Sequence, residues 1–409
     1  MDDPMPRLYI SGMDKDYEVI VIGCGGLGSA ALYRLSKELG PAVLGLEQFR
    51  LGHDRGASQD HSRIIRLAQH QPEYAALAPH AYEAWHEVER ESGLQLLLKT
   101  GGLIIEAVDD RDPEETGTRN IEGYVSAFEE HGFDYELLDP GELMRRWPQF
   151  HLSGSERAIY QEDSGLVDAR RANATHIALA RAHGAQILEE TPVRAVYPSG
   201  DGVEVVTDEQ VFRADRVVVA SDAWTNQVLA ETGVRIPLTV TQEQVTYYAT
   251  PNLRAFAPDS FPVFMWHGAH NYYGFPIYGE VATKLGQHMG GIGDPVTPES
   301  RDFEPDPVRV QRYRDFLSRH IPGFLGPELY TKTCLYTLPP DHNFIIDTLP
   351  EYPQISVAVG AGHAFKFAAL IGSILRDLAL DGETRHPIEA FRLERPAITT
   401  PAFAATFHV

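Results

Sequence analysis

The sequence predicts an α/β fold with two domains, one of them assembled from segments that are far apart along the chain. Three observations support this prediction. A strand, a glycine-rich turn, a helix and a second strand follow one another over residues 17–47, in the order of a βαβ unit. Another strand, glycine turn and apolar helix cover residues 355–380. Between them, residues 239–248 and 272–275 alternate with a period of two and are rich in aromatic residues, as expected of an antiparallel sheet.

The first βαβ unit indicates a nucleotide site in a Rossmann-like domain. A buried strand, a helix and a second strand are predicted at residues 17–23, 29–39 and 42–47. Glycines in the turn permit a pyrophosphate to approach the helix N-terminus, where free N–H groups and the dipole favour an anion; they are Gly23, Gly25 and Gly28. Glu47 follows where a carboxylate accepts hydrogen bonds from an adenosine ribose. This acid favours FAD or NAD over NADP, whose extra phosphate would require an arginine.

The other elements follow from the same periodicities. Helices are expected at residues 74–92 and 169–183, and strands at 101–106, 193–197, 203–207 and 217–220. We expect the charged residues 109–120 to form a solvated loop, and the proline-rich residues 295–326 to be mostly helix and loop.

Composition narrows the class of protein. The 409 residues include 35 Lys plus Arg and 58 Asp plus Glu, a net charge of −23. An acidic balance argues against a nucleic-acid partner or an anionic membrane surface, although it permits a small anionic ligand. Two distant cysteines, Cys24 and Cys334, indicate a reducing compartment. The longest apolar runs are far shorter than the roughly 20 residues of a membrane span. We expect a soluble cytoplasmic protein with a loose leader at residues 1–14 and no peroxisomal C-terminal tripeptide.

Several short segments, in this order, carry a family resemblance: residues 56–66, 273–276, 284–288, 333–337, 341–347 and 360–367. Together they resemble the monomeric sarcosine oxidase and N-methyltryptophan oxidase family of FAD-dependent amine oxidases, from Tyr17 to about Gly382. The resemblance implies an α/β fold with a discontinuous, Rossmann-like FAD-binding domain and a mainly antiparallel-sheet substrate domain. The expected FAD-binding segments are 15–92, 163–235 and 330–390, the substrate segments are 93–162 and 236–329, and 391–409 is a tail.

The resemblance also implies a flavin held covalently, through a thioether to Cys334. The alternative for Cys334 is a buried core cysteine, which is the interpretation we prefer for Cys24. The implied cofactor-binding residues are Gly23, Gly25, Leu27, Gly28, Glu47, Gln48, Ser62, Arg63, Val193, Cys334, Leu335, Gly362 and Lys366. No metal site is expected.

Catalytic and substrate residues follow from the same motifs. Lys284 matches the lysine that the family places over the flavin for reaction with oxygen, where a fixed cation stabilises developing superoxide. Arg63 matches an arginine that keeps this site positive. Arg66 and Lys366 match the pair that binds the substrate carboxylate.

The residues expected on the amine side of the pocket are Tyr273, Tyr336 and His288. The competing interpretations are a solvated lysine at 284, structural salt bridges at 66 and 366, and core packing for these three rings.

The chain departs from the family pattern at a few positions. Ser58 and Gln59 stand where the sarcosine oxidases carry another residue and a histidine, Asp222 replaces a glycine, and Ala364 replaces a glycine in the turn before Lys366. With these changes, more than one amino acid substrate stays open.

The predicted activity is oxidation of a secondary-amine amino acid such as sarcosine by molecular oxygen. The products are the demethylated amino acid, formaldehyde and hydrogen peroxide, and the protein is expected to be a monomer. A bulkier N-alkyl, cyclic or glycated amino acid is an alternative substrate. A nicotinamide-dependent dehydrogenase is a second alternative, which would explain the glycine turn but not Cys334 or Lys284. A third is a non-enzymatic flavin-binding protein, which would not need the basic residues that the chemistry requires.

Overall fold

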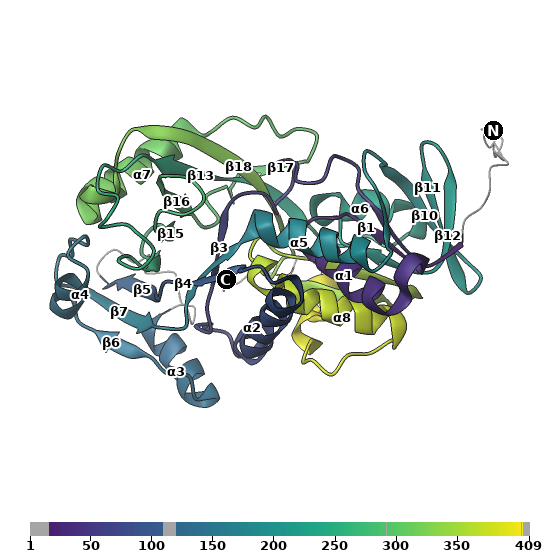
Figure 1. The fold of residues 1–409 in the computed structure, drawn as a ribbon, viewed down its shortest axis with the longest axis horizontal. Helices are drawn as coiled ribbons and strands as arrows, with labels where there is room; N and C mark the ends of the chain where they lie inside the picture. The colour runs from purple at the N-terminus through teal and green to yellow at the C-terminus, as the bar shows by residue number, and fades with distance from the viewer. Residues whose placement is uncertain (1–15, 109–119, 292, 402, 404–409) are drawn as a thin grey trace.

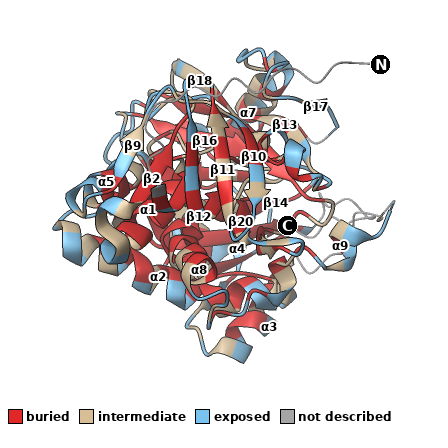
Figure 2. Ribbon diagram, turned by 90° about the vertical axis from the view of Figure 1, so that its right-hand side faces the viewer, coloured by how far each residue is buried: buried red, intermediate tan, exposed pale blue. Residues whose placement is uncertain are grey.

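The computed structural model describes residues 16–108, 120–291, 293–401 and 403. The predicted leader and the charged loop, apart from Asn120, lie outside the described residues. Two large sheets lie at opposite ends of the long axis, and a small three-stranded sheet lies between them (Figure 1). Buried residues are concentrated in the strands of the sheets and on the inner faces of the helices (Figure 2). No helix in these ranges has the length and apolar character needed to cross a membrane.

The eight-stranded sheet has a parallel centre, as the first βαβ unit predicts. Its order is β10-β11-β12-β1-β2-β9, with β20 beside β12 and β19 beside β20. Strands β9, β2, β1, β12 and β20 are parallel, whereas β10, β11 and β19 are joined by antiparallel pairs. The bounds are β1 Asp16–Ile22, β2 Val43–Leu46, β9 Gln186–Leu188, β10 Val193–Ser199, β11 Gly202–Thr207, β12 Val211–Val219, β19 Ile345–Leu349 and β20 Tyr352–Val359.

Both faces of this sheet are buried at its centre, which explains why residues 19–22 of β1 are all apolar. Val19 and Val21 pack on the side of the helices, and Ile20 and Ile22 pack on the opposite side against the β10–β12 ribbon and α6. The helices are α1 Gly26–Leu39, α2 Pro72–Ser92, α3 Ile121–His131, α4 Pro140–Arg146, α5 Ala169–Ala182, α6 Thr225–Val228, α7 Pro307–His320, α8 Ala368–Leu380 and α9 Pro396–Thr399. Helix α1 begins three residues before the predicted start because the turn glycines form its first turn.

The second large sheet is mainly antiparallel, as predicted. Its order is β17-β13-β16-β15-β14-β5-β7-β6, with β18 paired along the other edge of β13. Among the described strands of this sheet, only β14 and β5 are parallel. Strands β13 and β15 have the predicted bounds. The full set is β5 Gly102–Ala107, β6 Glu136–Leu138, β7 Glu156–Gln161, β13 Thr239–Tyr248, β14 Val263–His267, β15 Tyr272–Phe275, β16 Thr283–Gln287, β17 Pro295–Val296 and β18 Glu328–Leu338.

The small sheet connects the two halves of the molecule. Strands β3 Ser62–Ile65 and β4 Leu97–Lys99 pair with opposite edges of β8 Gly165–Asp168. Strand β18 lies mostly within the segment predicted for the FAD-binding domain, yet it pairs with β13 of the antiparallel sheet. The domain boundaries stay a prediction. The described part of the predicted tail is packed, because Phe391, Leu393 and Ala397 are buried.

The close approach of α1 to the turn that follows β1 leads to a prediction about stability. A Cβ atom at Gly28 would lie 1.8 Å from the carbonyl oxygen of Gly23, so Gly28→Ala must push the helix away from the turn. We expect the free energy of unfolding to fall by about 3 kcal/mol, measured by urea denaturation.

Gly293→Ala is the matched control, because a Cβ at Gly293 meets nothing within 4 Å. It should change the free energy of unfolding by less than about 0.5 kcal/mol. Equal losses in the two variants would contradict the prediction.

Candidate active site

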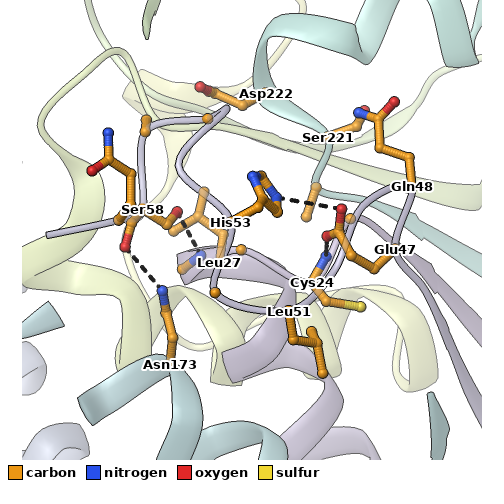
Figure 3. A pocket seen from close by; sticks show the side chains of 18 of the residues that line it. Cys24, Leu27, Glu47, Gln48, Leu51, His53, Ser58, Asn173, Ser221 and Asp222 are labelled. Atoms are coloured by element: carbon orange, nitrogen blue, oxygen red, sulfur yellow. Dashed lines mark hydrogen bonds and ion pairs between the residues drawn. The ribbon is translucent and has the colours of Figure 1, made fainter. Parts of the chain in front are cut away.

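Two adjoining cavities lie between the parallel sheet and the antiparallel sheet. The first has a volume of about 800 Å³ and is lined by the β1–α1 turn, the loop after β2 and the end of β12 (Figure 3). The second has a volume of about 170 Å³ and is lined by β3, β14–β16 and β18. The residues that line both are Ala57, Gln59, Asp60, Arg63, Lys332, Gly362 and Phe365. The described residues contain no cluster of His, Cys, Asp or Glu suited to a metal ion.

The glycine turn between β1 and α1 lines the first cavity. Gly23 has a φ of +88°, and a Cβ there would lie 2.7 Å from the carbonyl oxygen of Ala220. Because L side chains rarely adopt this conformation, the turn requires glycine. The Gly26 N–H donates a hydrogen bond of 2.7 Å to Ser58 Oγ. Ser58, one of the departures from the family pattern, therefore lies at the N-terminus of α1.

Glu47 is buried beside this turn (Figure 3). Its Oε2 accepts from the Cys24 N–H at 2.9 Å, and its Oε1 accepts from the Phe49 N–H at 3.0 Å. His53 Nε2 lies 3.4 Å from Oε1. Each carboxylate oxygen can accept more than one hydrogen bond, so Glu47 is fixed in place and retains capacity to accept from a ribose hydroxyl.

Most of the predicted cofactor-binding residues surround the two cavities. Gly23, Gly25, Leu27, Glu47, Gln48, Arg63, Val193 and Gly362 line the first cavity, and Ser62, Arg63, Cys334, Gly362 and Lys366 line the second. Two lie behind the walls: Gly28 packs against the turn, and Leu335 is fully buried. The binding roles of all these residues stay predictions.

Two cations in the second cavity have no carboxylate partner among the described residues. Lys366 is buried, and its Nζ donates to the carbonyl oxygen of His363 at 2.8 Å. Arg66 donates to the carbonyl oxygen of Ala68 and, at 3.5 Å, to Tyr124 Oη. Burial and the nearby charge of Arg66 lower the pKa of Lys366 well below its ordinary value. An anion bound between these two cations would offset the cost of burying the Lys366 charge and the repulsion between the two cations.

Lys284 has a different environment, since it is paired with a buried carboxylate. Its Nζ lies 2.9 Å from Asp60 Oδ2 and 2.8 Å from the Ser62 carbonyl oxygen. Arg63 donates to the carbonyl oxygens of Ala57, Gln59 and Ser62, and its Nη1 lies 3.6 Å from Asp60 Oδ2. Lys284 is only 2% exposed, which contradicts the alternative of a solvated surface lysine.

Cys334 is half-buried in the wall of the second cavity, close to this charged cluster. Burial raises the pKa of its thiol to about 11, and the positive charge of Arg63 opposes this increase.

On the same strand as Cys334, the ring of Tyr336 lies 5.8 Å from that of His288. A Cβ at Gly362 would lie 2.3 Å from the Tyr336 ring, so only glycine permits this packing. Tyr273 lines the same cavity.

Several residues of the site were not predicted from the sequence. Asp60 lies within the 56–66 motif, where an acid between Ser58 and Arg63 was the available signal. Tyr124 from α3, with His267 and Asn271 from the β14–β15 hairpin, lines the second cavity. Tyr124 Oη lies 3.3 Å from His267 Nε2, and His267 Nδ1 lies 3.3 Å from Asn271 Oδ1. Tyr124 and the two hairpin residues come from separate segments without a shared motif.

Asp222 generates a pH prediction. It lines the first cavity with a φ of +46°, and the Gly360 N–H donates to its Oδ1 at 3.4 Å. Burial raises the pKa of this carboxyl to about 6, and the Gly360 N–H opposes the rise. Between about pH 4 and pH 6 the native state holds a proton that the unfolded state releases, so the ionisable carboxyl lowers stability as the pH rises through this window.

Asp222→Asn removes this titration, and asparagine tolerates positive φ. The variant should therefore gain stability relative to the parent between pH 4 and pH 7, by about 1–2 kcal/mol because the group is partly screened by solvent. Urea denaturation over this range measures the difference. A difference that does not vary with pH would show that the carboxyl titrates normally.

Comparisons with known proteins agree with this architecture. Residues 18–378 match the FAD dependent oxidoreductase family. Monomeric sarcosine oxidase from Streptomyces avermitilis is 36% identical over 94% of this chain and 99% of its own length. N-methyl-L-tryptophan oxidase from Escherichia coli is 29% identical over 93% and 99%.

Among solved structures, NikD, described as an unusual amino acid oxidase essential for nikkomycin biosynthesis, superimposes with a TM-score of 0.80 and 27% identity, covering 92% of this chain and 97% of that one. The likeness therefore extends over most of the chain. The chain therefore belongs to the FAD dependent oxidoreductases and, within them, to the monomeric sarcosine oxidase and N-methyltryptophan oxidase family that its motifs resemble.

Proposed function

We propose that this protein is an FAD-dependent oxidase of a secondary-amine amino acid, such as sarcosine, with molecular oxygen as the electron acceptor. The observation that carries the proposal is the pair of cations, Arg66 and Lys366, which have no carboxylate partner among the described residues and face a small cavity. That cavity adjoins a larger one of about 800 Å³ beside the glycine turn. The products would be the demethylated amino acid, formaldehyde and hydrogen peroxide.

The residues around the larger cavity fit FAD. Gly23, Gly25 and Gly26 line this cavity, so their backbone is open to the approach of a pyrophosphate. Glu47 is placed to accept from a ribose hydroxyl. When bound, the flavin supplies the two-electron oxidation of the substrate's C–N bond.

The chain's own residues would bind and orient the substrate. The planar guanidinium of Arg66 and the ammonium of Lys366 would hold the α-carboxylate by charge-assisted hydrogen bonds. The aromatic walls formed by Tyr273, Tyr336 and His288 would exclude water and contact the amine and its N-substituent. Fixing the carboxylate at one end of a cavity of about 170 Å³ limits the positions that the N-substituent can take.

Two further roles are proposed for residues at the junction of the cavities. Lys284, buried within the protein, would supply the positive charge that favours reduction of oxygen. Cys334 would form the thioether to the flavin, with Arg63 favouring the thiolate. We also propose a monomer, since relatives from Streptomyces avermitilis and Arthrobacter are named monomeric sarcosine oxidase. The proposed cytoplasmic location rests on the two distant cysteines. Gel filtration tests the monomer.

A panel of amines with peroxide detection tests the activity and separates the substrate alternatives. Sarcosine, N-methyltryptophan, proline, pipecolate and a glycated amino acid cover the possibilities. The family assignment does not support the nicotinamide-dependent alternative, and the buried cations argue against a non-enzymatic role. If none of the amines reduces the bound flavin, the proposed substrate class is wrong.

Covalent attachment is tested by acid precipitation of the purified protein. We expect yellow flavin absorbance in the pellet of the parent and in the supernatant of Cys334→Ala, because the thioether survives acid and non-covalent contacts do not. Cys24→Ala is the matched control and should keep its flavin in the pellet. Flavin in the supernatant of the parent would show that the cofactor is not covalent.

Lys366→Met tests the carboxylate site, since methionine keeps the length of the buried side chain and removes its charge. A hydrogen bond to a charged group contributes about 1.5–3 kcal/mol, so KM for the amino acid should rise roughly 10- to 100-fold. Lys99→Met, which removes an exposed lysine paired with Asp163, should leave KM unchanged. An unchanged KM in Lys366→Met would assign the carboxylate to another residue.

A further inference from the structure

Asp60 is a buried carboxylate at the junction of the two cavities, in an unusual backbone conformation. It is 7% exposed and lines both cavities. Its φ is +99°, a region that favours glycine and costs a residue with a side chain on the order of 1–3 kcal/mol. Strain of this kind is stored where the surrounding structure requires the side chain.

Asp60 contacts two cations of the second cavity and a buried tyrosine. Its Oδ2 accepts from Lys284 Nζ at 2.9 Å and lies 3.6 Å from Arg63 Nη1. Its Oδ1 accepts from the hydroxyl of Tyr247 on β13. Burial acts to raise the pKa of Asp60, but Lys284, Arg63 and the Tyr247 hydroxyl together hold it below its ordinary value. The Asp60 carboxylate is therefore ionised at neutral pH, where Lys284 is protonated.

Lys284 depends on this partner for its charge. It lies on β16, and the groups facing it are Asp60 and Arg63 from the 56–66 segment, the ring of Tyr247 from β13, the ring of Phe275 from β15 and Cys334 from β18. Burial and the Arg63 charge lower the pKa of Lys284 to about 8, while Asp60 raises it. Without the Asp60 charge, the balance favours the neutral amine.

We propose that Asp60 is a positioning residue for the oxygen reaction: it holds the Lys284 ammonium in place and keeps it protonated, and so defines the pH range over which reduced flavin reacts with oxygen. This inference rests on the proposed function. In that half-reaction, the reduced flavin anion, one oxygen molecule and one proton give oxidised flavin and hydrogen peroxide, so two electrons pass from flavin to oxygen. The role of Asp60 is to preserve the cation beside the reacting oxygen.

A nuclear magnetic resonance titration tests the charge coupling without measuring activity. The chain contains six lysines, so holoenzyme labelled with 13C at lysine Cε gives few signals, and the Lys284 signal is identified by its loss in Lys284→Met. We expect the Lys284 signal to titrate near pH 8 in the parent. In Asp60→Asn, which keeps the shape and tolerates positive φ, its pKa should fall by roughly one unit or more, a tenfold loss of proton affinity.

Asp163→Asn is the matched control. Asp163 is the partner of Lys99 at 2.6 Å in an exposed ion pair, so this variant should leave the Lys284 titration unchanged. An Asp60→Asn enzyme with a parental Lys284 titration would overturn the inference.

The functional consequence is tested by stopped-flow reoxidation of photoreduced holoenzyme between pH 6 and pH 10. In the parent, the rate constant with oxygen should fall as pH rises through the Lys284 pKa. In Asp60→Asn, this fall should shift to lower pH by the same amount as the NMR titration. The Asp60→Asn/Lys284→Met double variant should match Lys284→Met alone.

These measurements separate two kinds of failure. If Lys284→Met reoxidises as fast as the parent, the oxygen site of the proposed function is wrong. If Lys284→Met is slow but Asp60→Asn follows the parental profile at every pH, only the inference about Asp60 is wrong. A purely structural role for Asp60 would lower stability without moving the profile.

Discussion

Burial of positive charge between the two large sheets is the constraint on which the site depends. The whole chain carries a net charge of −23, yet Arg63, Arg66, Lys284 and Lys366 converge on the second cavity with a single carboxylate, Asp60, among its lining residues. Taking an ion out of water costs several kcal/mol unless partners compensate. Here Asp60 and backbone carbonyls compensate Lys284 and Arg63, whereas Arg66 and Lys366 retain capacity for an anion. The acidic composition of the chain and the basic lining of the cavity are therefore consistent with each other, since an anionic substrate responds to the local charge of the cavity.

The fold holds these charges apart from solvent by joining distant segments. The parallel sheet presents the ends of β1 and β12 to the first cavity, and the antiparallel sheet presents β14–β16 and β18 to the second. Strand β3 of the small sheet pairs with β8 and places Arg63 where it lines both cavities. Such connections explain why the binding site combines residues from the first 70 positions with residues near 284, 334 and 366. A side chain that must stay protonated while buried needs partners from several elements at once, and this arrangement provides them.

The sequence predicted those parts of the structure that depend on local patterns. The β1–α1 turn, the strands β13 and β15 and the C-terminal strand and helix follow from periodicity and glycine placement, and the structure confirms them. Family motifs located Lys284, Arg66, Lys366 and Cys334, which the structure brings around one cavity. Strand β3 and helix α3 were missed because they are short or lack a distinctive period. Hydrogen bonds between distant segments were also missed. Asp60 and Tyr247 are 187 residues apart, and no sequence pattern relates them.

The environment of Cys334 shows how closely the proposed roles are coupled. Glu243 lies directly opposite Cys334 in the β13–β18 register and is buried. Burial raises the pKa of Glu243 to about 7, and the hydroxyl of Thr241 and the charge of Arg309 oppose this rise. When Glu243 is ionised it disfavours the Cys334 thiolate, while Arg63 favours it. Arg63 also contacts Asp60, the counter-ion of Lys284. The thiol proposed for flavin attachment and the ammonium proposed for oxygen reduction are therefore both affected by the charge of one arginine, and a substitution of Arg63 would perturb both.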